Sequence, residues 1–175
     1  MCCNNNTVLG NVNKGSVEEI WNGAEFQKVR NRMRGEGALS MCPHTCPVLQ
    51  EGKKYENLDW YKELSENSEQ RQNAVLNEEE YSSKQTFLKS NPRWFRFTYS
   101  YACNLDCYHC YQREDAKMRI KLPDSFMQEI PEYAKKAQVI FPFGGEPFFF
   151  KPVVNFLEQH DASLETRFHL ITNAT

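Results

Sequence analysis

The chain has 175 residues, a formal net charge of −2 and seven cysteines. Its length suits one ordinary domain or two small ones. A charge so near zero gives no reason to expect a nucleic-acid partner, and no apolar run approaches the roughly 18 residues of a membrane-spanning helix. The first residues lack the basic and apolar regions of a secretory signal. We therefore expect a cytoplasmic protein, without a nucleic-acid or membrane partner, whose cysteines are reduced metal ligands.

Residues 1–50 are predicted to form a small unit with two helices. Ser16-Val17-Glu18-Glu19 has the pattern of a capping box, which opens a helix. A second helical stretch follows, with Phe26, Val29 and Met33 on one face. The cysteines of this unit are Cys2, Cys3, Cys42 and Cys46.

Residues 51–92 are polar and rich in Glu, Asn, Gln and Ser. A short helix is predicted around Trp60 and Tyr61, and Asn77-Glu78-Glu79-Glu80 resembles the start of another helix. The charged run is expected to be a solvated helix face that carries no chemistry. We therefore interpret this segment as a connector with helical pieces.

Residues 93–175 alternate between strands and helices in the order β-α-β-α-β. The predicted strands are 94–101, 138–143 and 167–172, and the predicted helices are 125–136 and 153–160. Strands that alternate with helices favour a parallel sheet with right-handed crossovers. Ligands of such sheets bind at the carboxyl ends of the strands, and the residues that could carry chemistry all follow these ends.

Three cysteines follow the first predicted strand in the spacing C-x3-C-x2-C. Cys103, Cys107 and Cys110 can wrap one loop around a cubane cluster, in which ferredoxin-type sites give each of four irons a thiolate. Three thiolates leave one iron open for a small ligand with an amine and a carboxylate. A zinc site stays an alternative, although zinc needs four ligands and His109 is too cramped between its neighbours to be an obvious fourth.

Gly144-Gly145-Glu146-Pro147 follows the second predicted strand. Two adjacent glycines let the backbone approach a ligand closely, and the carboxylate can accept hydrogen bonds from an ammonium group. Pro147 fixes the exit of the chain. An ordinary strand-to-helix turn uses the same residue types. Asn173 follows the third strand and is a candidate to line the same site.

The cysteine run and the Gly-Gly-Glu-Pro segment together resemble the radical S-adenosylmethionine (radical SAM) superfamily. The resemblance implies that Cys103, Cys107 and Cys110 bind a [4Fe–4S] cluster, and that SAM chelates the open iron. It implies that the reduced cluster cleaves SAM to a 5′-deoxyadenosyl radical, and that residues 144–147 contact the amino group of SAM. The final residues resemble the Thr-Asn-Gly that often ends the family's third strand, with Ala174 in place of Gly.

The N-terminal unit resembles the later part of a SPASM or twitch domain, an auxiliary iron–sulfur module found with many radical SAM enzymes. The matching pieces are Cys2-Cys3, Glu19-Ile20-Trp21-Asn22, and the closing pair Cys42 and Cys46. The resemblance implies that these four cysteines help to bind a second iron–sulfur cluster. The module usually follows the catalytic core, whereas here it precedes it. The alternative is that the cysteines are simply small buried or surface residues.

The fold implied by the resemblance is α/β, with the first half of a parallel (βα)6 radical SAM partial barrel at 93–175. It is preceded by the cysteine-containing helical segment at 1–50 and the connector at 51–92. The family core usually has six βα units, and the sequence ends at the third strand. We therefore expect a truncated core.

The function implied is that of a radical SAM enzyme that abstracts hydrogen from a peptide or protein substrate, since many enzymes with a SPASM module modify peptides. A reductant such as flavodoxin or ferredoxin would supply the electron. One alternative is a non-catalytic iron–sulfur or zinc protein for electron transfer or scaffolding, which predicts no affinity for SAM. Another is a protein-interaction module with an incidental cysteine loop, which predicts no metal.

Overall fold

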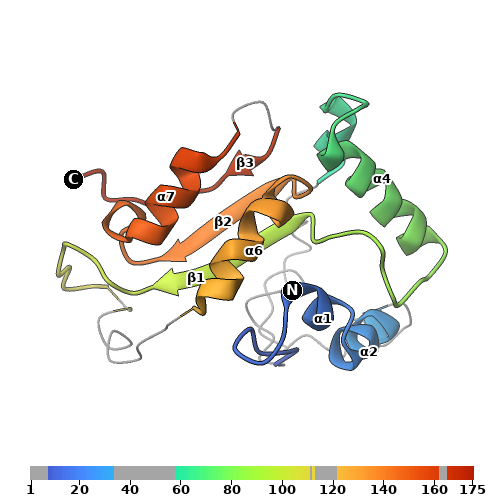
Figure 1. The fold of residues 1–175 in the computed structure, drawn as a ribbon, viewed down its shortest axis with the longest axis horizontal. Helices are drawn as coiled ribbons and strands as arrows, with labels where there is room; N and C mark the ends of the chain where they lie inside the picture. Colours follow the sequence, from blue (N-terminus) through green and yellow to red (C-terminus); the bar gives the residue numbers. More distant parts are fainter. Residues whose placement is uncertain (1–7, 34–57, 111, 113–121, 162–164) are drawn as a thin grey trace.

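The computed structural model describes residues 8–33, 58–110, 112, 122–161 and 165–175. Its centre is a parallel sheet of three strands in the order β1-β2-β3 (Figure 1). The strands are β1 (Trp94–Ser100), β2 (Val139–Gly144) and β3 (Arg167–Phe168). The register pairs Ser100 with Gly144, so β1 and β2 end at the same edge. The predicted α/β class and parallel sheet are confirmed, whereas the half of a (βα)6 barrel stays a prediction.

Two helices cover one face of the sheet (Figure 1): α6 (Asp124–Ala134) and α7 (Lys151–Gln159). Their bounds agree closely with the helices predicted at 125–136 and 153–160. Both carry buried apolar residues toward the sheet, which is the usual way in which an amphipathic helix gains stability. Within the described ranges, no helix combines the length and the apolar character needed to cross a membrane.

The face of β1 under α6 is aromatic, as the alternation in its sequence predicts. Phe95, Phe97 and Tyr99 are buried, because successive side chains of a strand point to opposite faces. Phe126 of α6 meets the Phe97 ring edge-on, with 5.6 Å between the ring centroids. Each buried phenylalanine contributes about 1.5–3 kcal/mol by leaving water. This face therefore anchors the strand from which the cysteine loop departs.

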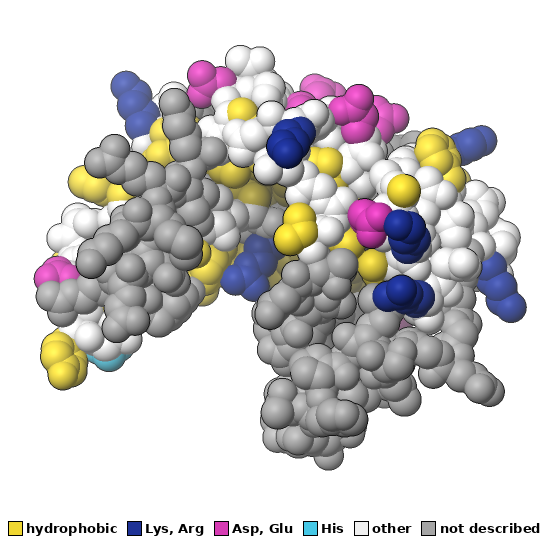
Figure 2. Space-filling model, turned by 90° about the horizontal axis from the view of Figure 1, so that it is seen from below, with side chains coloured by type: hydrophobic (Ala, Val, Ile, Leu, Met, Phe, Trp, Pro, Cys, Tyr) yellow, Lys and Arg dark blue, Asp and Glu magenta, His cyan; other side chains and the backbone are white. Residues whose placement is uncertain are grey.

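The opposite face of the sheet carries a mixed set of side chains. The Arg96 guanidinium of β1 lies over the Phe143 ring of β2, 4.2 Å from its centroid. Trp94 meets the His169 ring edge-on, with 5.3 Å between centroids. Figure 2, which views the molecule from below, shows hydrophobic and cationic side chains together within a hollow of the surface. Aromatic rings and a cation therefore lie side by side on this face.

The third strand is shorter than predicted. β3 pairs with β2 only through Arg167 and Phe168, so the prediction of a strand over 167–172 is wrong beyond Phe168. One further backbone hydrogen bond follows, from the His169 N–H to the Ile140 carbonyl at 3.0 Å. Beyond it the chain leaves the ladder, and its next polar groups bind the turn that follows β2.

The N-terminal unit contains α1 (Val17–Trp21) and α2 (Ala24–Met33). The predicted capping box is confirmed, because the Glu19 N–H donates to Ser16 Oγ at 3.2 Å and the Ser16 N–H donates to Glu19 Oε2 at 2.8 Å. This exchange satisfies two backbone donors at the helix start. The cysteines predicted to bind a second cluster lie outside the described residues: Cys2, Cys3, Cys42 and Cys46.

The connector holds a short 3-10 helix, η2 (Asp59–Glu63), where a short helix was predicted. It also holds α4 (Glu69–Ser82), which begins after Ser68. The prediction that a helix starts at 77–80 is wrong, because the helix already starts at Glu69. The Ser68 hydroxyl caps this start by accepting a hydrogen bond from the Arg71 N–H at 3.3 Å. The segment 77–80 lies in the second half of α4.

The prediction that the charged run in this segment is a solvated helix face is wrong for Glu80. Glu80 is only 2% exposed, and its carboxylate accepts hydrogen bonds from the N–H groups of Lys89 at 2.5 Å and Ser90 at 3.2 Å. Buried carboxylates need such donors to offset the loss of water. Glu80 therefore fixes the chain that returns from α4 toward β1.

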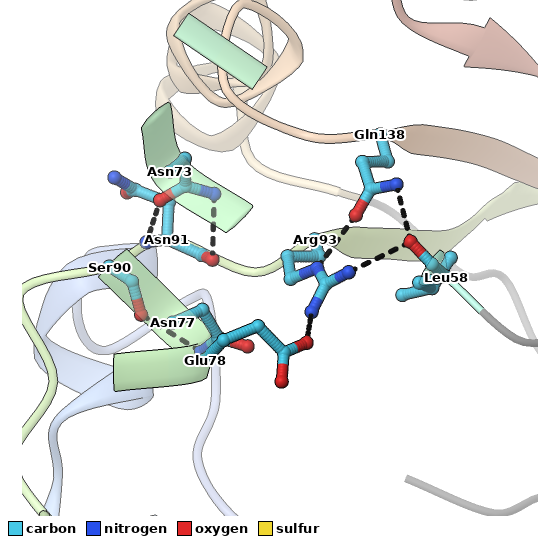
Figure 3. A network of polar contacts seen from close by, with 8 residues as sticks. All are labelled: Leu58, Asn73, Asn77, Glu78, Ser90, Asn91, Arg93 and Gln138. Carbon is cyan, nitrogen blue, oxygen red and sulfur yellow. Dashed lines mark hydrogen bonds and ion pairs between the residues drawn. The ribbon is translucent and has the colours of Figure 1, made fainter. Parts of the chain in front are cut away.

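Arg93, directly before β1, joins the connector to the sheet (Figure 3). Its Nε donates to Gln138 Oε1 at 2.6 Å, and its Nη2 donates to the Leu58 carbonyl at 2.9 Å. Its Nη1 forms an ion pair with Glu78 of α4. Gln138 Nε2 donates to the same Leu58 carbonyl at 3.0 Å. One buried guanidinium thus connects η2 and α4 to the amino ends of β1 and β2.

Candidate metal centre

The turn after β2 is bonded to the segment between β1 and the first cysteine of the loop. The Gly145 N–H donates to the Ser100 carbonyl at 2.8 Å, and the Glu146 N–H donates to the Ala102 carbonyl at 3.0 Å. The two strands end at one edge, so their following segments run alongside each other. As predicted from the strand order, the glycine turn therefore lies beside the start of the cysteine loop at Cys103.

The two glycines allow this approach of backbone to backbone. A Cβ atom on Gly144 would lie 2.1 Å from the Ser100 carbonyl oxygen, and one on Gly145 would lie 2.0 Å from the Ala102 carbonyl oxygen. Real Cβ atoms essentially never come within 3.0 Å of such an atom. The sequence predicted close approach to a ligand, and the structure shows close approach to the chain that leads into Cys103.

Tyr99 of β1 holds the Gly144-Gly145 turn through a hydrogen bond, a role that the sequence did not reveal. Its hydroxyl donates to the Gly145 carbonyl at 3.1 Å, and its ring stacks on Phe150 with 5.3 Å between centroids. Burial, together with the negative charges of Glu146 and Cys103, raises the pKa of Tyr99 far above its ordinary value. The hydroxyl therefore remains a proton donor throughout the neutral range.

Glu146 is 3% exposed, and its carboxylate faces the residues that follow β3. It accepts hydrogen bonds from the Thr172 hydroxyl at 2.8 Å, the Asn173 N–H at 2.8 Å and the Phe148 N–H at 3.2 Å. Burial by itself would raise the pKa of Glu146, but these three donors together hold it below its ordinary value. Pro147, which is also buried, then begins the 3-10 helix η3 (Pro147–Phe149). Glu146 thus joins the end of β2 to the chain that follows β3.

Asn173 lies beside the cysteine loop, and its part in a ligand site stays a prediction. Its Nδ2 donates to Asn104 Oδ1 at 2.9 Å and lies 3.8 Å from Cys103 Sγ. Asn104 Nδ2 in turn donates to Thr175 Oγ1 at 3.0 Å. Asn104 and Thr175 were missed by sequence reasoning, because only the fold shows that their short polar side chains meet.

The three cysteines of the loop are free thiols. Cys103 and Cys107 are exposed, and Cys110 is half-buried. The Leu105 N–H donates to Cys103 Sγ at 3.4 Å, and the Cys110 N–H donates to the Cys107 carbonyl at 3.1 Å. Three reduced, accessible thiols on one loop are the donor chemistry that an iron–sulfur cluster requires.

The cysteine loop does not form a site for a single metal ion. Among the described residues, no group of three or more His, Cys, Asp or Glu side chains is arranged to hold a metal ion. A cubane cluster gives each cysteine a different iron, so Cys103, Cys107 and Cys110 need not meet around a single ion to bind it. All three lie on one short loop, in which Cys103 and Cys107 are exposed.

Ala174 adopts a backbone conformation that favours glycine, with φ at 58°. An L-residue pays about 1–2 kcal/mol in this left-handed region, because its Cβ crowds the following carbonyl oxygen. We expect Ala174→Gly to raise the free energy of unfolding by about 1 kcal/mol in chemical denaturation, after the entropy that glycine adds to the unfolded chain is counted. The strained position also accounts physically for the glycine in the resembling Thr-Asn-Gly pattern.

Ala24→Gly is the matched control for this substitution. Ala24 is the exposed first residue of α2, where the same change is expected to lower stability by up to about 1 kcal/mol. Opposite signs for the two variants would support the strain at Ala174. A loss of stability in both would contradict it.

Comparison with known families agrees with this geometry. Residues 97–175 match the model of the radical SAM superfamily, and residues 1–47 match that of an iron–sulfur cluster-binding domain, SPASM. No curated protein and no solved structure matches the chain. The first match includes the cysteine loop, the glycine turn and Asn173, and the second includes the four N-terminal cysteines. The chain therefore carries a radical SAM segment at 97–175, preceded by a SPASM-like segment at 1–47.

Proposed function

We propose that Cys103, Cys107 and Cys110 bind a [4Fe–4S] cluster, and that SAM binds the iron which these thiolates leave open. One observation carries the proposal: the glycine turn is hydrogen-bonded to the residues that lead into Cys103. A ligand held at the cysteine loop would therefore lie beside the backbone of this turn. The match to the radical SAM superfamily supports the same assignment.

Held by Cys103, Cys107 and Cys110 and reduced, the cluster would supply one electron to cleave SAM to methionine and a 5′-deoxyadenosyl radical, which would take a hydrogen atom from the substrate. The chain's own residues bind and orient. Gly144, Gly145 and Glu146 would present backbone groups to the amino group of SAM. The Glu146 carboxylate already accepts three hydrogen bonds, so about one of its four acceptor positions remains for a further donor.

The N-terminal segment is proposed to bind a second iron–sulfur cluster. The SPASM match covers all four cysteines assigned to it, namely Cys2, Cys3, Cys42 and Cys46. A second cluster would give a route for electrons between an external reductant, such as flavodoxin or ferredoxin, and the substrate. We propose that the whole protein works in the cytoplasm, where such reductants and reduced cysteines occur.

A peptide or protein is the proposed substrate class. Arg96 lies over Phe143 on the sheet face opposite α6 and α7, and Trp94 is half-buried on the same face. Aromatic rings beside a guanidinium suit a chain that offers both apolar and acidic groups. The SPASM match supports this class by analogy, because many enzymes with this module modify peptides.

Anaerobic reconstitution with iron and sulfide tests the proposal. We expect the dithionite-reduced protein to give a [4Fe–4S]⁺ EPR signal that changes when SAM is added. The variant with Cys103→Ala, Cys107→Ala and Cys110→Ala is expected to lose the SAM-sensitive signal completely, because no thiolates remain for this cluster. Any signal left in the variant then belongs to the second cluster.

Two results would contradict the proposal. A cluster signal that ignores SAM would favour a non-catalytic electron-transfer or scaffold protein. Bound zinc without iron would favour the zinc alternative. Circular dichroism of the apo forms is the folding control, and the triple variant is expected to match the wild type because two of the three thiols are exposed.

A further inference from the structure

We propose that Asn173 is a positioning residue for Cys103, and that its amide raises the reduction potential of a cluster bound there by donating a hydrogen bond to the cysteine sulfur. This inference rests on the proposed cluster site. It goes beyond that site because it assigns a function to the chain after β3, which contacts the loop through the side chains of Asn173 and Thr175. Three successive sets of contacts carry the argument.

The first set fixes the backbone of Asn173. Its N–H donates to Glu146 Oε2 at 2.8 Å, and the neighbouring Thr172 hydroxyl donates to Glu146 Oε1 at 2.8 Å. Glu146 is itself almost fully buried and bonded to the residues before Cys103. Hydrogen bonds to a buried carboxylate are among the stronger ones in proteins. The base of the Asn173 side chain is therefore held at a fixed place relative to the cysteine loop.

The second set fixes which way the amide faces. Asn173 Oδ1 accepts from the Thr175 N–H at 3.1 Å and from Thr175 Oγ1 at 2.8 Å. Because the oxygen is taken by these donors, the amide nitrogen must point the other way. There it meets two acceptors, Asn104 Oδ1 at 2.9 Å and Cys103 Sγ at 3.8 Å. The orientation of the amide thus follows from the hydrogen bonds on both of its ends.

The third set concerns the sulfur. Cys103 Sγ accepts a hydrogen bond from the Leu105 N–H at 3.4 Å, in addition to the one from the Asn173 amide. A donor to a cysteine sulfur stabilises the more negative, reduced cluster, and thereby raises its reduction potential. Groups that hold the ligands of a metal site tune it in this way without touching the metal. Asn173 would therefore make the cluster easier to reduce.

The test is an EPR-monitored redox titration of the full chain with reconstituted clusters and without SAM. The signal of the second cluster is subtracted with the variant that lacks Cys103, Cys107 and Cys110. Asn173→Asp keeps the shape of the side chain, but it replaces the donor with an acceptor. We expect this variant to decrease the ratio of reduced to oxidised cluster tenfold at a given potential. For one electron this equals a midpoint potential lower by about 59 mV.

Two further variants complete the experiment. Asn173→Ala removes the donor without adding charge, and it should lower the potential in the same direction by a smaller amount. Asn155→Asp adds the same charge on the exposed surface of α7, and it should leave the potential unchanged. Iron and sulfide content per chain is measured for every variant, so that loss of cluster is not mistaken for a shift.

The outcomes separate this inference from the proposed function. If the wild-type chain assembles no cluster at all, the proposed function is overturned and takes this inference with it. If it assembles a cluster, but both Asn173 variants keep the wild-type midpoint potential, the inference alone is overturned. Here the potential counts as unchanged when the ratio of reduced to oxidised cluster differs by less than about twofold. An equal shift with Asn155→Asp would also overturn it, because surface charge would then explain the effect.

Discussion

Replacing Gly145 with alanine is expected to lower the free energy of unfolding by about 3 kcal/mol and to prevent assembly of the cluster at the cysteine loop. The added Cβ would lie 2.0 Å from the Ala102 carbonyl oxygen and 2.9 Å from the Tyr101 carbonyl carbon. These are backbone atoms and cannot turn aside as a side chain can. Either the turn or the segment before Cys103 must move, which costs both overpacking strain and the hydrogen bonds between them.

Chemical denaturation of the apo protein measures the loss of stability, and iron content after reconstitution measures cluster assembly. Gly15→Ala is the matched control, because the nearest atom to its new Cβ is Glu19 Oε2, at 2.9 Å and at the far end of a flexible side chain, whose shift would weaken only the capping hydrogen bond from the Ser16 N–H. We expect that variant to lose less than about 1 kcal/mol and to assemble the cluster normally. Equal stability in the two variants would contradict a rigid joint at Gly145.

Replacing Arg93 with methionine is expected to lower the free energy of unfolding by about 3 kcal/mol. The guanidinium is buried, with 9% of the residue exposed, and it donates to Gln138, to the Leu58 carbonyl and to Glu78. Methionine fills a similar volume but removes the guanidinium donor from Gln138 Oε1 and Glu78, while the Leu58 carbonyl keeps the Gln138 amide as a donor. Removing one partner of a buried charged network costs about 3–5 kcal/mol, and we take the lower end because Glu78 is partly exposed.

Arg93→Lys separates charge from geometry in this network. Lysine keeps the positive charge, but a single ammonium cannot reproduce the planar fork that reaches Gln138 and Leu58 together. We expect an intermediate loss of stability. Lys135→Met is the surface control, because the Lys135–Glu132 ion pair is largely exposed and should contribute nothing measurable. A loss for Arg93→Met no larger than that of the control would show that the network does not stabilise the fold.

Elements that depend on neighbouring residues were predictable from the sequence. The aromatic alternation of Phe95, Phe97 and Tyr99 predicted a strand with one buried face, and the structure buries these three residues. The capping box of Ser16 and Glu19 predicted the start of α1. Strand alternation and capping are set within a few residues, so the order of amino acids is enough to show them.

Helix α4 shows where such patterns fail. Its buried side includes Gln70, Asn73 and Glu80, so no apolar stripe marks the helix. Each of these polar residues is buried because a distant group satisfies it: for example, Gln70 Nε2 donates to Thr166 Oγ1 at 3.0 Å. A solvated charge run and a buried polar network have the same composition, and only the partners distinguish them.

By itself, the sequence determined the parallel α/β order, the three-cysteine loop and the strand ends at which the candidate site would lie. The tertiary structure alone decided how those ends are joined. It ended β3 after Phe168 and placed the Glu146 carboxylate on Thr172 and Asn173, and it brought the Asn173 amide to Cys103. These contacts depend on the distance and direction between groups that are far apart in the chain, which the local spacing of residues does not encode.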